Sequence, residues 1–448
     1  VLAFSEEEER RLEDLRRNGE KNGVEGLEIV DRKRLEELEP EVGPQARSAL
    51  HCRETGIVSP YEYCIALAEN AVHNGVELRL KAELTGVEKT AAGAFRLEWG
   101  EPEERKAEER KPESGEPEWG VRENREGETG ENLRAPRAAA DDGTTKTRKE
   151  ATCDFLVNAA GGYADKIAAL AGDGSISIHP KQGQYLIFQR GTGKTARQVV
   201  FQAPSERGKG VLVSSTTWGN LLVGPNSEEI PERDDTSTNE EILRYIVSSA
   251  RRSIPGFDLT KVIRSFSGVR ATEQRKDFVV GPSASVEGLV HAAGIDSPGL
   301  TSSTAIAERV AGELERLGLE LEEDESFDPF RDSITLPHPL APFSEVKERI
   351  ELPEGDPNRI VCRCEQVPES VLLDALRRGI RVDSLDAVKR RSRAGMGPCQ
   401  GQFCGPRVRS LVAKELGIST EEVGPRGPGS GPLPERVDRA RLRKLDKA

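Results

Sequence analysis

Two short segments near the carboxyl end, VCRCEQ at 361–366 and RAGMGPCQGQFCGP at 393–406, carry the clearest chemical signal in the sequence. Four of the seven cysteines lie in them, with the spacing C-x-C-x34-C-x4-C: Cys362, Cys364, Cys399 and Cys404. Four thiolates in two close pairs suit an iron–sulfur cluster or a zinc ion. The glycines around the second pair leave room for backbone N–H groups to approach the sulfur atoms.

Three assignments compete for these cysteines. A structural zinc site also uses four cysteines, but its pairs are usually separated by two to four residues, and C-x-C fits that pattern poorly. Disulfides would leave three further cysteines over, and no secretion signal is visible. The spacing favours an iron–sulfur cluster and leaves zinc and disulfides open. Pro406 suits the first turn of a helix, which would place Cys404 at the positive helix end, where a thiolate is favoured.

The composition is that of a globular protein with a highly charged surface. Of 448 residues, 32% are charged and 35% hydrophobic, which predicts two to three domains with a large core. The formal net charge of −13 argues against binding to nucleic acid or to an anionic membrane. No apolar run is long enough to span a bilayer, and the few, clustered cysteines fit a reducing cytoplasm. We expect the other three, Cys52, Cys64 and Cys153, to be small buried side chains.

Composition also suggests where the domains divide. Residues 1–50 are expected to form helices with charged faces, and the chain opens inside one, without an initiator methionine. Residues 100–150 are rich in Glu, Arg and Gly, so we expect most of this segment to be a disordered surface insertion, with an acidic–basic interaction loop as the alternative. A proline-rich linker with little regular structure is expected at 321–355, and a flexible tail at 419–448.

Two stretches place glycines between an apolar strand and a helix. The first is CDFLVNAAGGYADKIAALAG at 153–172, and the second is GLVHAAGIDSPGLTSSTAIAERVAGELERLG at 288–318. Strand–glycine–helix units bring backbone close to a bound nucleotide cofactor. A glycine pair after a strand is weak evidence by itself, because an ordinary tight turn has the same appearance. Between these stretches, IHPKQGQYLIFQ at 178–189 and NLLVGP at 220–225 predict strands.

Three segments together resemble the D-amino-acid-oxidase-like FAD family. They are NAAGGYAD at 158–165, SGVRATEQRKDFVVGPS at 267–283 and HAAGIDSPGLTSSTAIAERVA at 291–311. Within that family the chain is most similar to FAD-dependent glycerol-3-phosphate dehydrogenases and L-2-hydroxyglutarate oxidases. The cysteine segments resemble the [2Fe–2S] domain related to bacterioferritin-associated ferredoxin. This resemblance implies an α/β FAD-dependent oxidoreductase domain over 1–320 and a small helical [2Fe–2S] domain over 356–418.

One family element is missing from the chain. The family begins with a strand–GxGxxG–helix unit that holds the FAD pyrophosphate at a helix N-terminus. Nothing here matches it, and residue 1 falls after its expected place. We therefore expect the fold without its first βαβ unit, either because the chain is a fragment or because it binds flavin weakly.

The resemblance implies which residues form the flavin and substrate site. Those expected against FAD are Ala160, Gly161, Gly162, Gly294, Ser297, Pro298, Gly299, Leu300 and Thr301, although packing alone can explain any one of these glycines. Arg270 is the expected catalytic residue, holding a substrate phosphate or carboxylate over the flavin, with Arg275 and Lys276 as alternatives. Candidates for proton transfer are His51, His179 and His291, for each of which a structural role is the commoner alternative.

The implied reaction removes a hydride from a carbon bearing a hydroxyl or amine to FAD. Electrons then leave singly through the cluster to a quinone or a redox protein. The implied substrate is a small anion: sn-glycerol 3-phosphate, or alternatively a 2-hydroxy acid or an amino acid. A non-catalytic iron–sulfur electron-transfer subunit is the alternative of another class. The sequence leaves open a peripheral association with a membrane, made through a partner.

Overall fold

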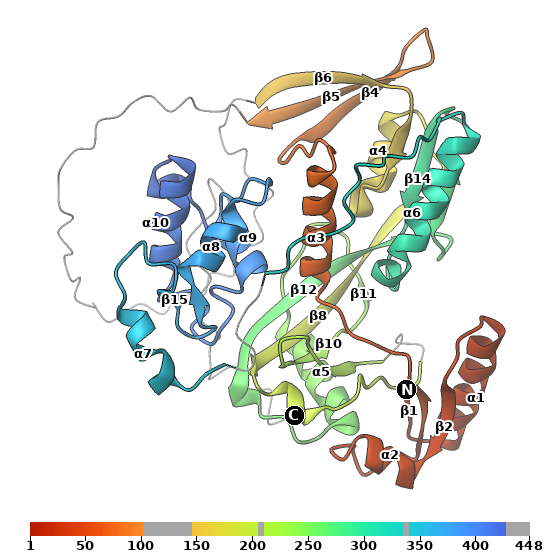
Figure 1. Cartoon of the computed structure of the whole chain (residues 1–448). Coiled ribbons are helices and arrows are strands. Elements are labelled where there is room, and N and C mark those ends of the chain that lie inside the picture. The colour runs from red at the N-terminus through yellow and green to blue at the C-terminus, as the bar shows by residue number, and fades with distance from the viewer. Residues whose placement is uncertain (103–145, 205–209, 335–339, 427–448) are drawn as a thin grey trace, which may run out of the picture.

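The computed structural model describes residues 1–102, 146–204, 210–334 and 340–426 (Figure 1). Helix α3 (Pro60–His73) stands between the cysteine-rich carboxyl-terminal elements, drawn in blue, and the rest of the chain. Within these residues, no helix is both long enough and apolar enough to cross a bilayer.

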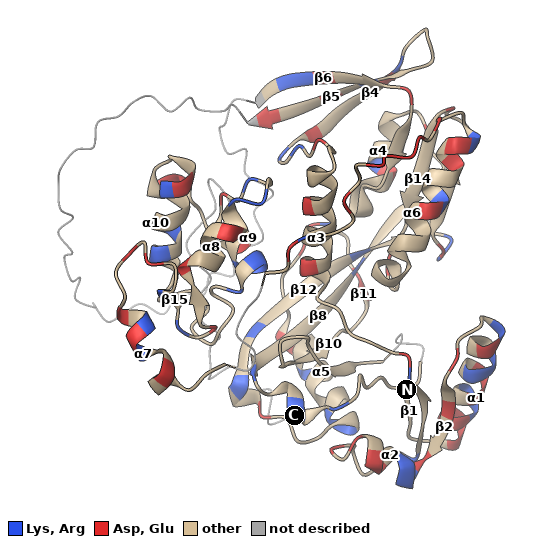
Figure 2. Ribbon diagram, in the orientation of Figure 1, with Lys and Arg blue, Asp and Glu red and all other residues tan. Residues whose placement is uncertain are grey.

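The first fifty residues contain a small sheet as well as helices. Its strand order is β1 (Leu2–Ala3), β3 (Ser48–Cys52) and β2 (Leu27–Asp31), with antiparallel pairing throughout. Helices α1 (Glu6–Lys21) and α2 (Arg32–Leu38) accompany it, and α1 carries both signs of charge along its length (Figure 2). The expectation of helices alone was wrong. Strands this short show no clear alternation, and their burial comes from neighbouring strands and α1.

The central sheet is antiparallel and holds the largest core. Its order is β11 (Glu228–Glu229), β8 (Ile178–Arg190), β10 (Asn220–Gly224) and β9 (Leu212–Ser215), and β12 (Val262–Glu273) also pairs with β8. Helix α5 (Glu240–Ser253) packs on this sheet and is capped by Asn239, whose Oδ1 accepts from Glu241 N–H at 2.8 Å. Fully buried side chains here are Leu186, Phe188, Leu221 and Ile246. A single turn η2 (Gly193–Thr195) follows β8, and another single turn, η3 (Leu259–Lys261), precedes β12.

A second sheet contains both strand–glycine–helix units. Strand β7 (Leu156–Asn158) pairs in parallel with β14 (Leu289–Ala293), and β13 (Val279–Pro282) pairs antiparallel with β14. A turn η1 (Gly161–Tyr163) and helix α4 (Ala164–Leu170) follow β7, whereas α6 (Gly299–Arg316) follows β14. Because β7 and β14 are parallel, their carboxyl ends meet at one edge of the sheet. Both predicted glycine turns therefore lie at that edge.

A third sheet defines the ends of the expected insertion. Strands β4 (Glu83–Lys89), β5 (Phe95–Pro102) and β6 (Lys146–Cys153) are antiparallel neighbours. Residues 100–102 and 146–150 are therefore strand, contrary to the expectation for 100–150, and residues 103–145 lie outside the described residues. The error arises because β6 is polar along most of its length and takes its order from pairing with β5, not from an apolar pattern.

The carboxyl-terminal elements have a hydrophobic core of their own. They comprise the hairpin β15 (Ile360–Cys362) and β16 (Val367–Pro368) and the helices α8 (Glu369–Leu376), α9 (Leu385–Ser392) and α10 (Gly405–Leu416). The apolar side chains that fill this core include Val367, Leu372, Val382, Val388 and Val412. Such a core explains how so small a unit holds its cysteine loops in place.

Two segments expected to lack structure contain ordered elements. Helix α7 (Phe343–Glu351) occurs inside the expected linker and buries Val346. Residues 419–426, expected to begin the flexible tail, include a turn η4 (Thr420–Glu422) and the buried Val423. The carbonyl groups of Gly424 and Pro425 then accept from the first N–H groups of α9, at 3.2 and 2.9 Å. These groups would otherwise lack partners, which explains the ordering. Residues 335–339 and 427–448 lie outside the described residues.

Candidate active site and cluster site

The turn after β7 presents bare backbone. Ala160 precedes η1, and Asn158 holds the turn by accepting from Ala160 N–H at 3.3 Å and donating to Ala164 O at 2.8 Å. Gly161 has φ of +54°, and a Cβ on Gly161 or Gly162 would meet no atom within 4 Å. A group such as a nucleotide can therefore approach this turn closely.

A group of buried polar residues, Asn158, Asp173 and His291, supports that turn. His291 is 2% exposed; its Nε2 lies 3.0 Å from Asp173 Oδ2 and its Nδ1 lies 3.3 Å from Asn158 Nδ2. Since the Asn158 amide can only donate there, Nδ1 accepts and Nε2–H donates to Asp173. Burial by itself raises the pKa of Asp173, but hydrogen bonds from Ser283, Ser175 and His291 outweigh it and hold that pKa well below its ordinary value. Both ring nitrogens of His291 are thus occupied in supporting the turn.

The loop after β14 is joined to the end of β12. Gly294 has φ of +64°, and a Cβ there would lie 2.5 Å from Glu273 Cβ, so packing alone already requires glycine. Thr272 Oγ1 donates to Asp296 Oδ2 at 3.0 Å. The remaining expected flavin residues follow directly, through the first turn of α6: Ser297, Pro298, Gly299, Leu300 and Thr301. The loop therefore contacts the end of β12 directly.

Arg270 lies on the face of the β8–β12 ribbon next to this loop. It is paired in register with Lys181, and Thr272 is paired with His179. Directly opposite residues of an antiparallel pair share a face, so Arg270 and Lys181 emerge side by side. A Cβ on Gly183 would lie 2.7 Å from Arg270 Nη2, which shows that the guanidinium folds back over that glycine. Lys181 was not among the predicted residues; only the strand register identifies it.

The alternatives to Arg270 lie off its strand face. Arg275 is 60% exposed and its Nε lies 3.1 Å from Glu273 Oε2. Lys276 is exposed in the turn after β12, with φ of +60°. His51 is on β3, in a different sheet, where burial lowers its pKa. Of the three candidate histidines, His179 alone shares a face with Arg270.

The four cluster cysteines lie in two pairs. Cys364 Sγ is 3.5 Å from Cys399 Sγ, and the thiols of Cys362 and Cys404 are close enough to shift each other's pKa. The Cys404 thiol lowers the pKa of Cys362 to about 7, and burial raises that of Cys364 to about 12. In the part of the chain that the structure describes, no three metal-ligating side chains already form a closed metal site. Two thiol pairs nevertheless match a [2Fe–2S] cluster, in which two cysteines bind each iron.

Glycines and backbone amides shape the cluster loops. The backbone N–H groups of Gly395 and Glu365 help to lower the pKa of Cys362, as expected for amides close to a cluster sulfur. A Cβ on Gly397 would lie 2.3 Å from Cys364 Cβ, so no side chain fits there. Cys404 is the N-cap of α10, with Pro406 in the first turn, as the sequence predicted.

The other cysteines depart from expectation. Cys64 is exposed, and Cys52 and Cys153 are only half-buried. Cys52 ends β3 opposite Leu27, and Cys153 ends β6 opposite Phe95.

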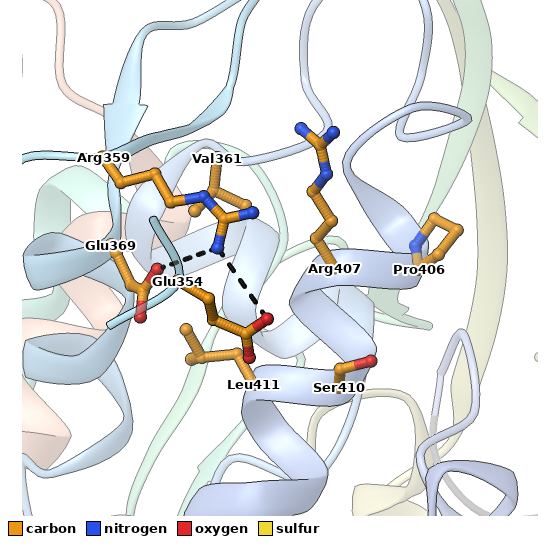
Figure 3. A pocket seen from close by; sticks show the side chains of 8 residues that line it. All are labelled: Glu354, Arg359, Val361, Glu369, Pro406, Arg407, Ser410 and Leu411. Carbon is orange, nitrogen blue, oxygen red and sulfur yellow. Dashed lines mark hydrogen bonds and ion pairs between the residues drawn. The ribbon is translucent and has the colours of Figure 1, made fainter. Parts of the chain in front are cut away.

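A small pocket flanks the cluster loops (Figure 3). Its lining residues are Glu354, Arg359, Val361, Glu369, Pro406, Arg407, Ser410 and Leu411. Arg359 Nη1 lies 3.5 Å from Glu369 Oε2 and 4.0 Å from Glu354 Oε2. The two carboxylates of the lining balance the two cations, Arg359 and Arg407, so no net positive charge marks this pocket as an anion site.

The geometry can be compared with known proteins. Residues 1–313 match the family model for FAD dependent oxidoreductases, and residues 360–414 match the BFD-like [2Fe-2S] binding domain. The chain belongs to the FAD-dependent oxidoreductase family. Its cofactors are FAD and a [2Fe–2S] cluster, and within the family it is of the glycerol-3-phosphate dehydrogenase type.

Individual family members support this placement. The chain is 35% identical to a glycerol 3-phosphate dehydrogenase of Caloramator mitchellensis over 94% of its own length and 78% of the relative. It is 25% identical to the anaerobic glycerol-3-phosphate dehydrogenase subunit A1 of Haloferax volcanii, over 88% and 65% of the two chains. The dithionite-reduced, FAD-bound L-alpha-glycerophosphate oxidase of Mycoplasma pneumoniae has a TM-score of 0.58 at 22% identity, covering 73% of this chain and 74% of that one. This last likeness concerns the fold.

Proposed function

We propose that the protein oxidises sn-glycerol 3-phosphate and passes the electrons through the [2Fe–2S] cluster to a quinone or a redox protein. The observation that supports it most is the pair of cations Arg270 and Lys181 on one strand face, beside the loop at 294–301. A guanidinium and an ammonium together suit a phosphate dianion. The Caloramator mitchellensis relative is named for the same substrate.

Two backbone turns are proposed to hold FAD. Ala160, Gly161 and Gly162 leave open space over their backbone, and the loop from Gly294 to Thr301 ends in the N-terminus of α6. Helix N-termini favour negative charge, which a reduced flavin carries. When bound, FAD supplies a two-electron acceptor and the cluster supplies a one-electron carrier.

The strand face is proposed to orient the substrate. Arg270 and Lys181 bind the phosphate, which displaces the exposed Glu229 carboxylate that lies 3.4 Å from Lys181 Nζ. The adjoining surface is open at Gly268, whereas the Arg270 guanidinium and Pro225 cover Gly183. Nothing lies within 4 Å of a Cβ placed on Gly268. His179 is the proposed acceptor of the hydroxyl proton, because it shares this face and is exposed.

A substrate panel tests the proposal. The purified protein, reconstituted with FAD and iron–sulfur cluster under anaerobic conditions, is mixed with sn-glycerol 3-phosphate, glycerol, an L-2-hydroxy acid or an amino acid. Bleaching of the flavin absorbance by glycerol 3-phosphate alone, followed by cluster reduction, is expected. Bleaching by the hydroxy acid instead would show that the two cations hold a carboxylate. Binding of a cluster but no FAD would favour the electron-transfer subunit.

A further inference from the structure

A buried carboxylate next to the cluster cysteines lies between two guanidinium groups. Glu365 directly follows Cys364, and its side chain is 1% exposed. Its Oε2 lies 2.9 Å from Arg393 Nε and 3.5 Å from Arg190 Nη1. Arg393 begins the segment that leads to Cys399, whereas Arg190 ends β8 in the oxidoreductase domain. The contact therefore joins the two domains.

An aromatic ring helps to shield this set from water. The ring centroid of Trp218 lies 4.8 Å from Arg393 Cζ and 5.5 Å from Arg190 Cζ. The indole N–H donates to Glu62 Oε1 at 2.6 Å, and Arg393 Nη2 donates to Asn220 Oδ1 at 3.3 Å. The Arg190 and Arg393 side chains are only 9% and 4% exposed. Charges held in such a low-dielectric place act on one another, and on nearby groups, more strongly than surface charges do.

The same residues adjoin the cluster sulfurs. A Cβ on Gly397 would lie 3.4 Å from Cys364 Sγ and 3.4 Å from Glu365 Oε1, so the carboxylate lies next to that sulfur. A [2Fe–2S] cluster on four thiolates is negatively charged and becomes more so when it takes up an electron. A nearby cation therefore raises its reduction potential, and a nearby anion lowers it.

We propose that Arg190, Glu365 and Arg393 are positioning residues through which the oxidoreductase domain sets the reduction potential of the cluster. Glu365 and Arg393 come from the cluster domain, but Arg190 comes from the other one. The potential of the docked cluster then differs from that of the cluster domain alone, and docking favours uptake of an electron. The inference rests on the proposed function only for the direction in which electrons flow.

Redox titration of the full-length protein, loaded with its cluster and with no substrate present, tests this. Glu365→Gln removes an anion and is expected to raise the cluster's midpoint potential. Arg190→Gln removes a cation on the other domain and is expected to lower it. The double variant Glu365→Gln/Arg190→Gln is expected to return towards the wild-type potential, and Glu365→Asp, which keeps the charge, to remain close to it.

The controls separate tuning from simple loss of structure. Arg377→Gln breaks the ion pair of Arg377 with Glu415 in the cluster domain, but at a site where Arg377 is 61% exposed. Solvent screens such a pair, so no shift is expected. The electron paramagnetic resonance signal of each variant shows that its cluster is intact.

Three results overturn the inference: shifts of the two single variants in the same direction, no shift with Arg190→Gln, or a double variant that does not compensate. If Glu365→Gln loses its cluster, Arg190→Gln alone decides. Failure of the proposed function is recognised separately, because a different substrate leaves every one of these potentials unchanged.

Discussion

Arg270 and Lys181 show how two distant residues become one site. Eighty-nine positions apart in the sequence, they face one another because β8 and β12 keep one register from Arg264 to Glu273. Neither residue lies in a motif that would mark it alone. The proposed contact with a phosphate depends on both, since each cation contributes a charge-assisted bond and the two together balance the charge of a dianion.

Replacing Arg270 is expected to impair substrate use. Arg270→Ala should lower kcat/KM for sn-glycerol 3-phosphate by about 10- to 150-fold, the equivalent of about 1.5–3 kcal/mol for bonds to a charged group. Steady-state assays with an artificial electron acceptor measure this. Arg275→Ala is the matched control, because Arg275 is exposed and paired with Glu273. An equal loss in the control, or no loss with Arg270→Ala, contradicts the assignment.

Asp173 is expected to contribute a pH-dependent part of the stability. Its pKa is depressed in the folded protein, so its contribution is present above the unfolded pKa of about 3.9 and is lost as the pH falls through the folded pKa. Asp173→Asn should therefore lower the free energy of unfolding by about 1–3 kcal/mol at pH 7, and by less below pH 4. Urea unfolding at both pH values measures the difference. Asp14→Asn, at a side chain 69% exposed on α1, is the control and should change little.

Individual site residues could be predicted from the sequence only where the chemistry of the site requires a rare residue pattern. Four cysteines in C-x-C and C-x4-C pairs can be recognised without a structure. Lys181 could not be, because a single lysine in a strand has no local signature and its partner is set by register. For His291 the sequence left two roles open, proton transfer and the commoner structural one, and the buried partners of both ring nitrogens favour the structural role.

At the scale of single elements, the loops that carry the cluster cysteines leave no room for an added side chain. Gly397→Ala is expected to abolish cluster binding, because its Cβ would lie 2.3 Å from Cys364 Cβ. Iron content and the electron paramagnetic resonance signal after anaerobic reconstitution measure this. Gly312→Ala, in α6 with no atom within 4 Å of the new Cβ, should keep a full signal. A full iron complement in Gly397→Ala would show that the loop can move aside.

Elements with strong local signals were predicted, and those formed by pairing were not. The two strand–glycine–helix units and helix α10 follow from apolar runs, glycines and a proline at fixed places. Strands β1, β2 and β6 are short or polar, so their order comes from neighbours that the local sequence does not reveal. Helix α7 was missed because prolines dominate the composition around it.

At the scale of the whole molecule, the insertion at 103–145 connects the adjacent ends of β5 and β6. Pro102 and Lys146 are opposite partners in the β5–β6 pair, so the chain departs from and returns to neighbouring points. Replacing residues 103–145 by an Asn-Gly turn should leave the fold intact and raise the free energy of unfolding by up to about 3 kcal/mol, since closing a shorter loop costs less entropy. Thermal unfolding measures this, and retained cluster absorbance is the control. Loss of the folded state would show that the insertion itself contributes to the core.

The packing between the domains could not be predicted from the sequence. Glu69 on α3 is 3% exposed and receives Arg331 at 2.6 Å, Arg391 at 3.4 Å and Arg378 at 3.9 Å. These arginines come from the segment after α6 and from the cluster domain. In the sequence each of these arginines resembles an ordinary surface residue. Only the fold shows that all three contact one carboxylate.

Strand β8 begins near the proposed substrate site and ends at the cluster domain. Lys181 and Arg190 lie nine residues apart on it, which is about 30 Å at the rise of an antiparallel strand. One added or deleted residue between them would reverse the face of every side chain beyond it and shift one site relative to the other. Among relatives of this protein, β8 should therefore vary in composition but not in length.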